Sequence, residues 1–325
     1  MKPKVYILFI LPLIVLTLAL SAVAFWWVDS LKSPNSTFLQ KQSFIIQKGE
    51  TGAAIAKDLK SQGLVKNDLV FRIYLRIKNI TKSLPPGEYE LSPSQNLQSI
   101  VATLSKGPIG VWVTVPEGVR REQIAERIIE SFELSGDKAK TFYDEFLKET
   151  EGQEGYLFPD TYIFLKSSSV TNIVAKLKST FDQKTQNLNI TTGLSLRQTV
   201  ILASIVERET GKFEENPFVA GILLNRLNAG WPLQADATVQ YILGTPQKWW
   251  PNVLSEDLKI KSSYNTYTFA GLPIAPIANP GLNALEAAAN PKDTPYWYYL
   301  HDSGGQIHYA KTLEEHNANI AKYLQ

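Results

Sequence analysis

The feature that most restricts the fold of this chain is its apolar amino-terminal segment, in which no charged residue occurs from Val5 to Val28. An α-helix rises about 1.5 Å per residue, so this segment would be roughly 35 Å long and could cross a bilayer core. Lys2 and Lys4 precede the segment, and Asp29 follows it. Because basic residues favour the cytoplasmic side, this asymmetry predicts a single-pass anchor with a cytoplasmic amino terminus and an extracytoplasmic remainder.

A cleaved signal peptide is the alternative interpretation, because Ala22-Val23-Ala24 resembles a small-residue cleavage site. The apolar run is long for a signal peptide, however, and Trp26 and Trp27 would follow the cut directly. Tryptophan is instead favoured at a membrane interface. We therefore assign residues 1–29 to a cytoplasmic tip and a transmembrane helix, and we expect the protein in the plasma (inner) membrane.

The composition limits the chemistry that the exported part can use. The 33 basic and 31 acidic residues give a formal net charge of +2, so we expect no nucleic-acid partner. The absence of cysteine excludes disulfides, thiol nucleophiles and thiolate metal sites. The histidines, His301, His308 and His316, lack the spacing of a zinc motif. We therefore expect neither a metal nor any other cofactor.

Beyond the anchor, short strands alternate with amphipathic helices, which predicts an α+β fold. Residues 30–42 are polar and aperiodic, and we interpret them as a stalk. Residues 43–108 form a small module that begins with a strand at 43–47, a Lys48-Gly49-Glu50-Thr51 turn and a helix, with a second strand near Tyr89. This order resembles a LysM peptidoglycan-binding module. The alternative is a packing domain that only spaces the anchor from the remainder.

Residues 109–325 are expected to form a larger, mixed α+β domain. Helices are predicted over about 121–130, 172–188, 218–227, 282–290 and 313–324, and strands at 111–115, 297–300 and 308–310. The segment from about 262 to 281 is irregular but rich in aromatic and apolar residues. This combination is typical of a functional loop rather than of disorder.

The most informative helix of this domain is predicted between Ser195 and Gly211. Ser195 and Gln198 match a capping box, and Gly211 is a stop signal. The polar arc of the helix is narrow, so we expect it to be buried on most sides.

Two carboxylates end this helix and project to different sides. Glu209 lies on the main apolar stripe, whereas Glu207 points toward a smaller apolar patch. A carboxyl group among apolar side chains has a raised pKa and can serve as a general acid near neutral pH. The pattern favours Glu209 slightly over Glu207. The alternative is an exposed helix end, at which Glu209 merely pairs with Lys212.

A further aromatic segment extends from Glu154 to Phe164 and includes Asp160. Its rings and Asp160 could line a sugar site, because rings stack on apolar sugar faces while polar groups bind hydroxyls. The same residues could instead form an aromatic core loop.

Taken together, the motifs resemble those of the YceG-like family. The motifs that carry the resemblance are Ala203–Thr210, Leu233–Val239, Tyr264–Tyr267, Gly271–Pro273 and Ala278–Gly281. The resemblance covers nearly the whole chain, including the anchor, the LysM-like module and residues 154–160. One departure is at Ala235 and Ala237 around Asp236, where the family pattern often has Thr and Pro.

The resemblance implies a lyase, an endolytic lytic transglycosylase. Such an enzyme cleaves the β-1,4 bond between N-acetylmuramic acid and N-acetylglucosamine inside nascent glycan strands and leaves a 1,6-anhydro-muramoyl end, which terminates strand elongation. The family's catalytic glutamate corresponds to Glu209. Ordinary glycosidases need two carboxylates, whereas here the sugar's own C6 hydroxyl replaces water and one residue serves as acid and then base. The implied partners are peptidoglycan glycan strands, the membrane and peptidoglycan synthases.

The candidates for holding sugar groups near Glu209 are polar residues of these motifs. They are Gln234, Asp236, Tyr264, Asn265, Tyr267, Asn279 and Asp160. Each has a structural alternative: loop bracing for Asn, a buried ring for Tyr, and helix capping for the two aspartates. Two other functions stay open, a hydrolytic muramidase with Asp236 or Asp160 as second carboxylate, and a non-catalytic wall-binding scaffold.

Overall fold

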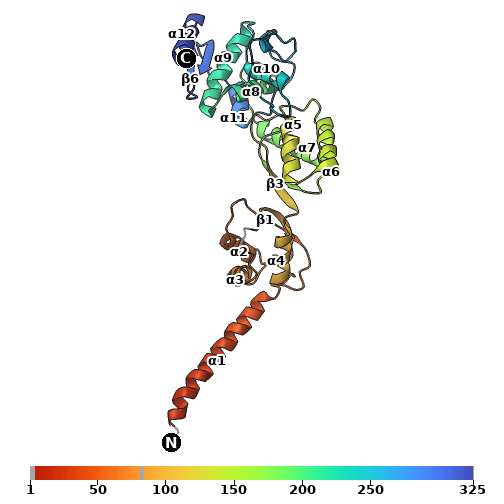
Figure 1. Ribbon diagram of the computed structural model, residues 1–325, viewed down its shortest axis with the longest axis vertical. Coiled ribbons are helices and arrows are strands. Elements are labelled where there is room, and N and C mark those ends of the chain that lie inside the picture. Colours follow the sequence, from red (N-terminus) through yellow and green to blue (C-terminus); the bar gives the residue numbers. More distant parts are fainter. Residues whose placement is uncertain (1–3, 81–83, 325) are drawn as a thin grey trace. The chain divides into compact units, whose positions relative to one another are not determined.

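The computed structural model describes residues 4–80 and 84–324 and has the α+β composition that the sequence predicts (Figure 1). Contacts divide the chain into two compact units. The first comprises residues 1–112 and 163–167, and the second comprises residues 113–162 and 168–325. The chain thus divides after Trp112, whereas the sequence suggested a boundary after residue 108.

Helix α1, Lys4–Leu31, contains the apolar segment. Its stretch Pro12–Leu31 has a mean hydropathy of 1.8 and is long and apolar enough to cross a membrane. Only 6% of that stretch is buried inside the protein, so its side chains are available to lipid. The helix continues beyond residue 29, where we expected the stalk to begin.

The remainder of the first unit packs three helices against a strand pair. Strand β1, Gln42–Ile46, runs antiparallel to β2, Gly87–Leu91. The helices are α2 (Gly52–Ser61), α3 (Asp68–Ile77) and α4 (Leu97–Lys106), each begun by a Thr or Asn side chain that accepts a backbone N–H. The expected elements are therefore present, while the LysM resemblance stays a prediction.

Strands β3 (Gly110–Thr114) and β4 (Thr161–Leu165) complete a sheet of order β1-β2-β3-β4. Strand β4 was not predicted, because every residue of it after Thr161 is apolar or aromatic, which hides the alternation of a strand. The structure shows the alternation in burial: Tyr162 and Phe164 are buried, while Thr161 and Leu165 are exposed.

The second unit is mainly helical and carries one hairpin. Its helices are α5 (Arg121–Ser131), α6 (Gly136–Glu149), α7 (Val170–Thr185), α8 (Leu196–Glu209), α9 (Asn216–Asn228), α10 (Asp236–Leu243), α11 (Leu282–Ala289) and α12 (Leu313–Tyr323). Strands β5 (Tyr298–His301) and β6 (Ile307–Ala310) pair antiparallel. Residues 262–281 are irregular, as predicted.

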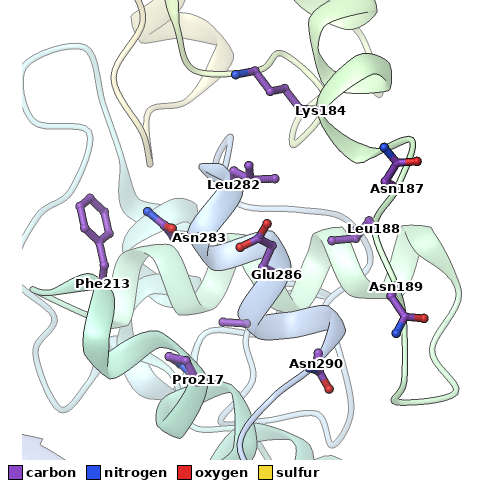
Figure 2. Close-up of a pocket in the computed structure, with 11 residues that line it drawn as sticks. Lys184, Asn187, Leu188, Asn189, Phe213, Pro217, Leu282, Asn283, Glu286 and Asn290 are labelled. Atoms are coloured by element: carbon purple, nitrogen blue, oxygen red, sulfur yellow. The ribbon is translucent and has the colours of Figure 1, made fainter.

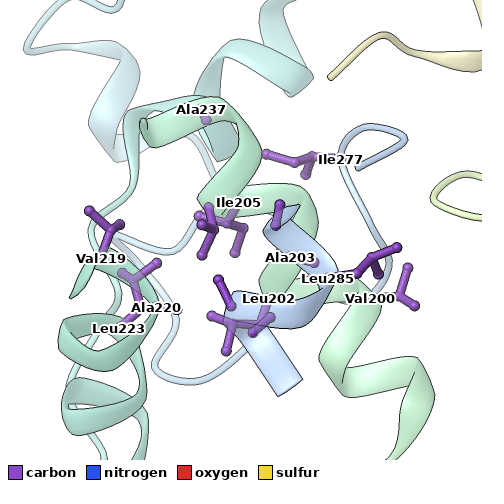
Figure 3. Close-up of a cluster of buried hydrophobic side chains, with 14 of the residues drawn as sticks. Val200, Leu202, Ala203, Ile205, Val219, Ala220, Leu223, Ala237, Ile277 and Leu285 are labelled. Atoms are coloured by element: carbon purple, nitrogen blue, oxygen red, sulfur yellow. The ribbon is translucent and has the colours of Figure 1, made fainter. Parts of the chain in front are cut away.

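Helix α8 lies at the centre of the second unit's core (Figure 3). The predicted capping box is present: the Ser195 hydroxyl accepts the Gln198 N–H, and the Gln198 side chain accepts the Ser195 N–H. Every residue from Thr199 to Val206 is buried, against α9, α10 and α11. A helix fixed at its start and enclosed along its length holds its last residue, Glu209, in a defined position.

Truncation of a side chain in this core should therefore destabilise the second unit. We expect Leu202→Ala, at a fully buried position, to lower the free energy of unfolding by about 2–5 kcal/mol through lost burial and a cavity. The matched control is Leu196→Ala on the same helix, where the side chain is 43% exposed, and it should cost less than about 1 kcal/mol. Denaturant unfolding followed by tryptophan fluorescence measures both; equal losses would contradict the central packing of α8.

Candidate active site

The carboxyl end of α8 borders a cleft of about 390 Å³ in the second unit, which we call the Glu209 cleft. Its lining residues come from α8, α9, the 234–236 segment, the 267 loop, strand β5 and α12. They are Glu209, Arg226, Gln234, Asp236, Tyr267, Tyr298, Tyr299, Leu300, His301, Leu313 and His316. The structure thus brings together four residues that the sequence singled out: Glu209, Gln234, Asp236 and Tyr267.

Two groups of the protein donate hydrogen bonds to the Glu209 carboxyl group. The Tyr299 hydroxyl donates to Oε2 over 2.9 Å, and the Ala237 N–H, in the first turn of α10, lies 3.4 Å from Oε1. Burial raises the pKa of Glu209, and the nearby Asp236 carboxylate adds to the rise, while these two hydrogen bonds and His301 oppose it. The net effect is a raised pKa, so Glu209 has the environment of a general acid.

The segment that carries Gln234 and Asp236 is fixed to the loop that carries Tyr267. The Gln234 N–H donates to the Thr266 carbonyl over 3.1 Å, and the Tyr267 hydroxyl donates to Asp236 Oδ1. Gln234 has a φ of 52°, a left-handed conformation that is uncommon for a non-glycine residue. Both Gln234 and Asp236 are exposed, so their polar groups are available to a ligand.

The departure from the family pattern at Ala237 has a structural consequence. Its backbone N–H contacts Glu209 Oε1, and a proline at this position would have no N–H to donate. The side chains of Ala235 and Ala237 are both buried, and therefore they contribute packing rather than ligand contacts.

Four other candidates lie outside the Glu209 cleft. Asn265 is 1% exposed, and its Nδ2 donates to the carbonyls of Leu258 and Ile260. The Tyr264 ring packs against Tyr241 with centroids 4.9 Å apart. Asn265 therefore braces its loop, while the half-buried Tyr264 ring packs against another ring, and a contact of Tyr264 with sugar stays a prediction.

Asp160 is exposed, and its Oδ1 accepts a local hydrogen bond from the N–H of the next residue, Thr161, over 2.7 Å. Its other oxygen lies 3.9 Å from Lys184 Nζ. The neighbouring Leu157 and Phe158 are buried and belong to the core, while a sugar site along this segment stays a prediction.

Asn279 is fully buried and connects two loops. Its Oδ1 accepts the N–H groups of Gly155 and Leu157 at 2.9 and 3.0 Å. Its Nδ2 donates to the Val119 carbonyl and, over 2.6 Å, to Glu154 Oε1. With both ends of its amide occupied, Asn279 braces the scaffold.

The partner of Asn279, Glu154, is a second buried carboxyl group. It also accepts the Arg121 N–H over 3.1 Å. Burial raises the pKa of Glu154 to about 8, and Glu122 adds to the rise, against the opposing effect of Arg120. Sequence reasoning did not single out Glu154 itself, because its burial depends on segments far apart in the chain.

Glu207, the alternative candidate for the general acid, contacts a different part of the protein from Glu209. Its Oε2 accepts the Gly281 N–H over 3.0 Å. Burial raises the pKa of Glu207 to about 7, and Glu117 adds to the rise. Two glutamates of α8 therefore have raised pKa values, but only Glu209 lines the cleft that also contains Asp236 and Tyr267.

Sequence reasoning missed two residues that organise the cleft. Tyr299 contacts Glu209 directly, although 90 positions separate them. Arg226 donates to the carbonyls of Trp297 and Leu233 at 2.8 and 2.6 Å, which ties strand β5 to the Gln234 segment. No local pattern indicates these contacts, because each joins distant segments.

In the part of the chain that the structure describes, no group of three His, Asp or Glu side chains converges to hold a metal ion.

Comparison with known proteins identifies the family. The model of the YceG-like family matches residues 44–322. The chain belongs to this family. A relative from Bacillus subtilis named endolytic murein transglycosylase is 32% identical over 305 residues, which cover 86% of this chain and 84% of the relative.

Two further relatives and one solved structure are also similar to this chain. Two Streptococcus pneumoniae proteins, also named endolytic murein transglycosylase, are each 28% identical; the alignments cover 91% of this chain but only 61% of the relatives' length. A crystal structure of a YceG-like protein from Listeria monocytogenes has a TM-score of 0.55 and 28% identity, and covers 86% of this chain and 99% of that one.

Removal of the Tyr299 hydroxyl should raise the pKa of Glu209 further. In Tyr299→Phe the burial persists, while a hydrogen bond that favours the ionised carboxylate is lost. Carbon-13 NMR titration of the side-chain carboxyl groups measures the shift. Tyr298→Phe is the matched control, because Tyr298 lines the same cleft without contacting Glu209 in the described structure. A lower or unchanged pKa in Tyr299→Phe would show that this hydrogen bond does not tune Glu209.

Glu154 should make the stability of the protein depend on pH. Its folded pKa of about 8 exceeds its ordinary value of 4.5, so its neutral form stabilises the fold below the ordinary pKa, and this contribution is lost as pH rises toward 8. Each unit of difference corresponds to about 1.4 kcal/mol. Glu154→Gln should flatten the decline in unfolding free energy between about pH 5 and pH 8. An equally steep decline in the variant would exclude Glu154 as its source.

Proposed function

We propose that this chain is an endolytic murein transglycosylase that uses Glu209 as its single acid and base. The observation that carries the proposal is the Glu209 carboxyl group itself, which is desolvated, has a raised pKa and lines a cleft beside polar groups of three other segments. The names of the relatives support the substrate class, peptidoglycan. The site supports a reaction that needs one protonated carboxyl group.

The reaction begins with proton transfer from Glu209 to the oxygen that links C1 of N-acetylmuramic acid to N-acetylglucosamine. As the C1–O bond breaks, positive charge develops on the muramic acid ring. Its C6 hydroxyl then attacks C1 and gives its proton to the Glu209 carboxylate, which restores the acid. No water is consumed, and one strand end becomes a 1,6-anhydro-muramoyl residue.

Neighbouring groups suit both stages of this cycle. The Tyr299 hydroxyl and the Ala237 N–H donate to the Glu209 carboxylate that forms after the first proton transfer. The Asp236 carboxylate, oriented by Tyr267, adds negative charge in the same cleft, where it would stabilise an oxocarbenium-like transition state. The exposed side chain of Gln234 is placed to bind a sugar hydroxyl or acetamido group.

A hydrolytic muramidase is the second candidate, because Asp236 shares the cleft with Glu209 and could activate water. Asp160 does not support this candidate, since it lies with Thr161 and Lys184. A non-catalytic scaffold would not require a desolvated carboxyl group in a cleft.

The reaction would take place outside the cytoplasm, at the plasma membrane. Helix α1 would anchor the protein in the plasma membrane with its amino terminus in the cytoplasm, which places the second unit with the extracytoplasmic glycan. There the enzyme would cut strands beside the synthases that make them and so end their elongation. The LysM-like unit would bind peptidoglycan.

Mass spectrometry of the products tests the reaction. Uncrosslinked glycan strands incubated with the protein should give fragments whose new ends are one water lighter than reducing ends. Glu209→Gln should lower the rate by at least about 100-fold, because general acid catalysis contributes at least that much. The matched control is Glu207→Gln, which removes the other α8 carboxyl group and should retain activity.

Two results would contradict the proposal. Reducing ends in place of anhydro ends would identify a muramidase. A Glu209→Gln variant as active as the wild type would remove Glu209 from the mechanism.

A further inference from the structure

The second unit has another concave surface, which the proposed mechanism does not use. A groove of about 490 Å³ lies between the end of α7, the start of α9 and the length of α11. Figure 2 shows α11 crossing it, with Phe213 on one side and the Asn187–Asn189 segment on the other. We call it the α11 groove.

The walls of the α11 groove carry polar side chains that have no side-chain partner among the residues that the structure describes. The amides of Asn187, Asn189 and Asn283 and the carboxylate of Glu286 are exposed and make no side-chain hydrogen bond in the described residues. Side-chain amides carry donors and an acceptor together. An acetamido group likewise carries one N–H donor and one carbonyl acceptor, so one asparagine side chain of the groove can donate to its carbonyl while another accepts from its N–H.

An exposed aromatic ring stands at the edge of the α11 groove. Phe213 is 59% exposed, although a large apolar side chain is normally buried. Half-buried Leu188 and Leu282 add apolar surface to the walls. Apolar surface beside a few polar groups is the usual composition of a small-molecule site, and a sugar ring offers an apolar face to stack on Phe213.

The charges of the α11 groove favour a neutral ligand. Lys184, the cation among its lining residues, lies 3.9 Å from Asp160 and over the Phe158 ring. Glu286 would repel a phosphate or another anion at close range. A neutral, N-acetylated sugar is not repelled by Glu286 and does not need Lys184 as a counter-charge.

A second hollow shares one lining residue with the α11 groove and lies beside the residues that follow Glu209. This hollow, of about 320 Å³, is lined by Thr210 and Gly211, which directly follow Glu209, and it shares Phe213 with the groove. A linear polymer bound in the groove could therefore continue along the segment from Phe213 to Thr210 toward the carboxyl end of α8.

From these observations we infer that the α11 groove is a second saccharide site, which binds N-acetylated sugar units of a glycan strand apart from the bond that is cut. The assignment of the ligand to a glycan strand rests on the proposed function. Binding at such a site would raise the affinity for long strands without changing the chemistry at Glu209.

A binding experiment tests this inference separately from catalysis. The full chain, carrying Glu209→Gln and solubilised in detergent, is titrated calorimetrically with the tetramer of N-acetylglucosamine. The double variant Asn187→Ala/Asn283→Ala and the single variant Phe213→Ala, made in the same background, should each weaken binding about five- to tenfold, because hydrogen bonds or stacking surface are lost. All three positions are exposed, so the fold should be retained.

Matched controls come from outside the groove. Asn172→Ala, at an exposed position on α7, and Phe269→Ala, where the ring is 54% exposed, should leave the dissociation constant unchanged. An unchanged constant in both groove variants, or an equal loss in the controls, would overturn the inference. Displacement of the tetramer by a sugar-free stem peptide would also overturn it, since it would identify a peptide site.

The active chain provides a second test. With long uncrosslinked strands, the groove variants should raise KM about five- to tenfold and leave kcat unchanged. A loss of kcat with KM unchanged would contradict a remote binding role. If the wild type cuts no glycan but the groove variants still weaken binding of the tetramer, the proposed function fails while the saccharide site stands.

Discussion

The site depends on one electrostatic balance, between the burial of the Glu209 carboxyl group and the two hydrogen bonds that it accepts. Burial favours the protonated form, whereas the Tyr299 hydroxyl and the Ala237 N–H favour the ionised form. A carboxyl group that first donates and then recovers a proton needs a pKa near neutral pH, so that both its protonated and its ionised form are accessible. Burial also raises the pKa of Glu154, to about 8, but that carboxyl group is engaged by Asn279 and the Arg121 N–H rather than lining the cleft.

The scaffold maintains this balance by fixing each donor through contacts between distant segments. The buried length of α8 positions Glu209. Arg226 ties β5, which carries Tyr299, to the Gln234 segment, and Thr266 ties that segment to the Tyr267 loop. Asn279 and Glu154 brace the loops that surround the end of α8. These two buried polar residues therefore position the side chains of the site by holding the loops in place, and they do not line the Glu209 cleft.

The sequence predicted the local structure well, because helix periods and caps are local properties. The capping box at Ser195 and Gln198 is present, and α8 ends at Glu209 next to the expected stop signal. Strand β4 was missed because its residues are almost all apolar. Gln234, Asp236 and Tyr267 line the cleft, but Asn265 and Asn279 are buried and brace loops. An asparagine in a turn-rich motif looks the same in either role. Only the tertiary fold distinguishes them, and only the fold places Tyr299 beside Glu209.

In the proposed reaction one carboxyl group acts as acid and base, and water takes no part. Isotope labelling would reveal any participation of water: glycan strands are cleaved in water enriched in oxygen-18, and the new muramoyl ends are analysed by mass spectrometry. We expect no oxygen-18 in these ends, because the nucleophile of the proposed reaction is the C6 hydroxyl of the sugar. Oxygen-18 at C1 of the new ends would contradict it and would assign Asp236, the other carboxylate of the cleft, the role of activating water.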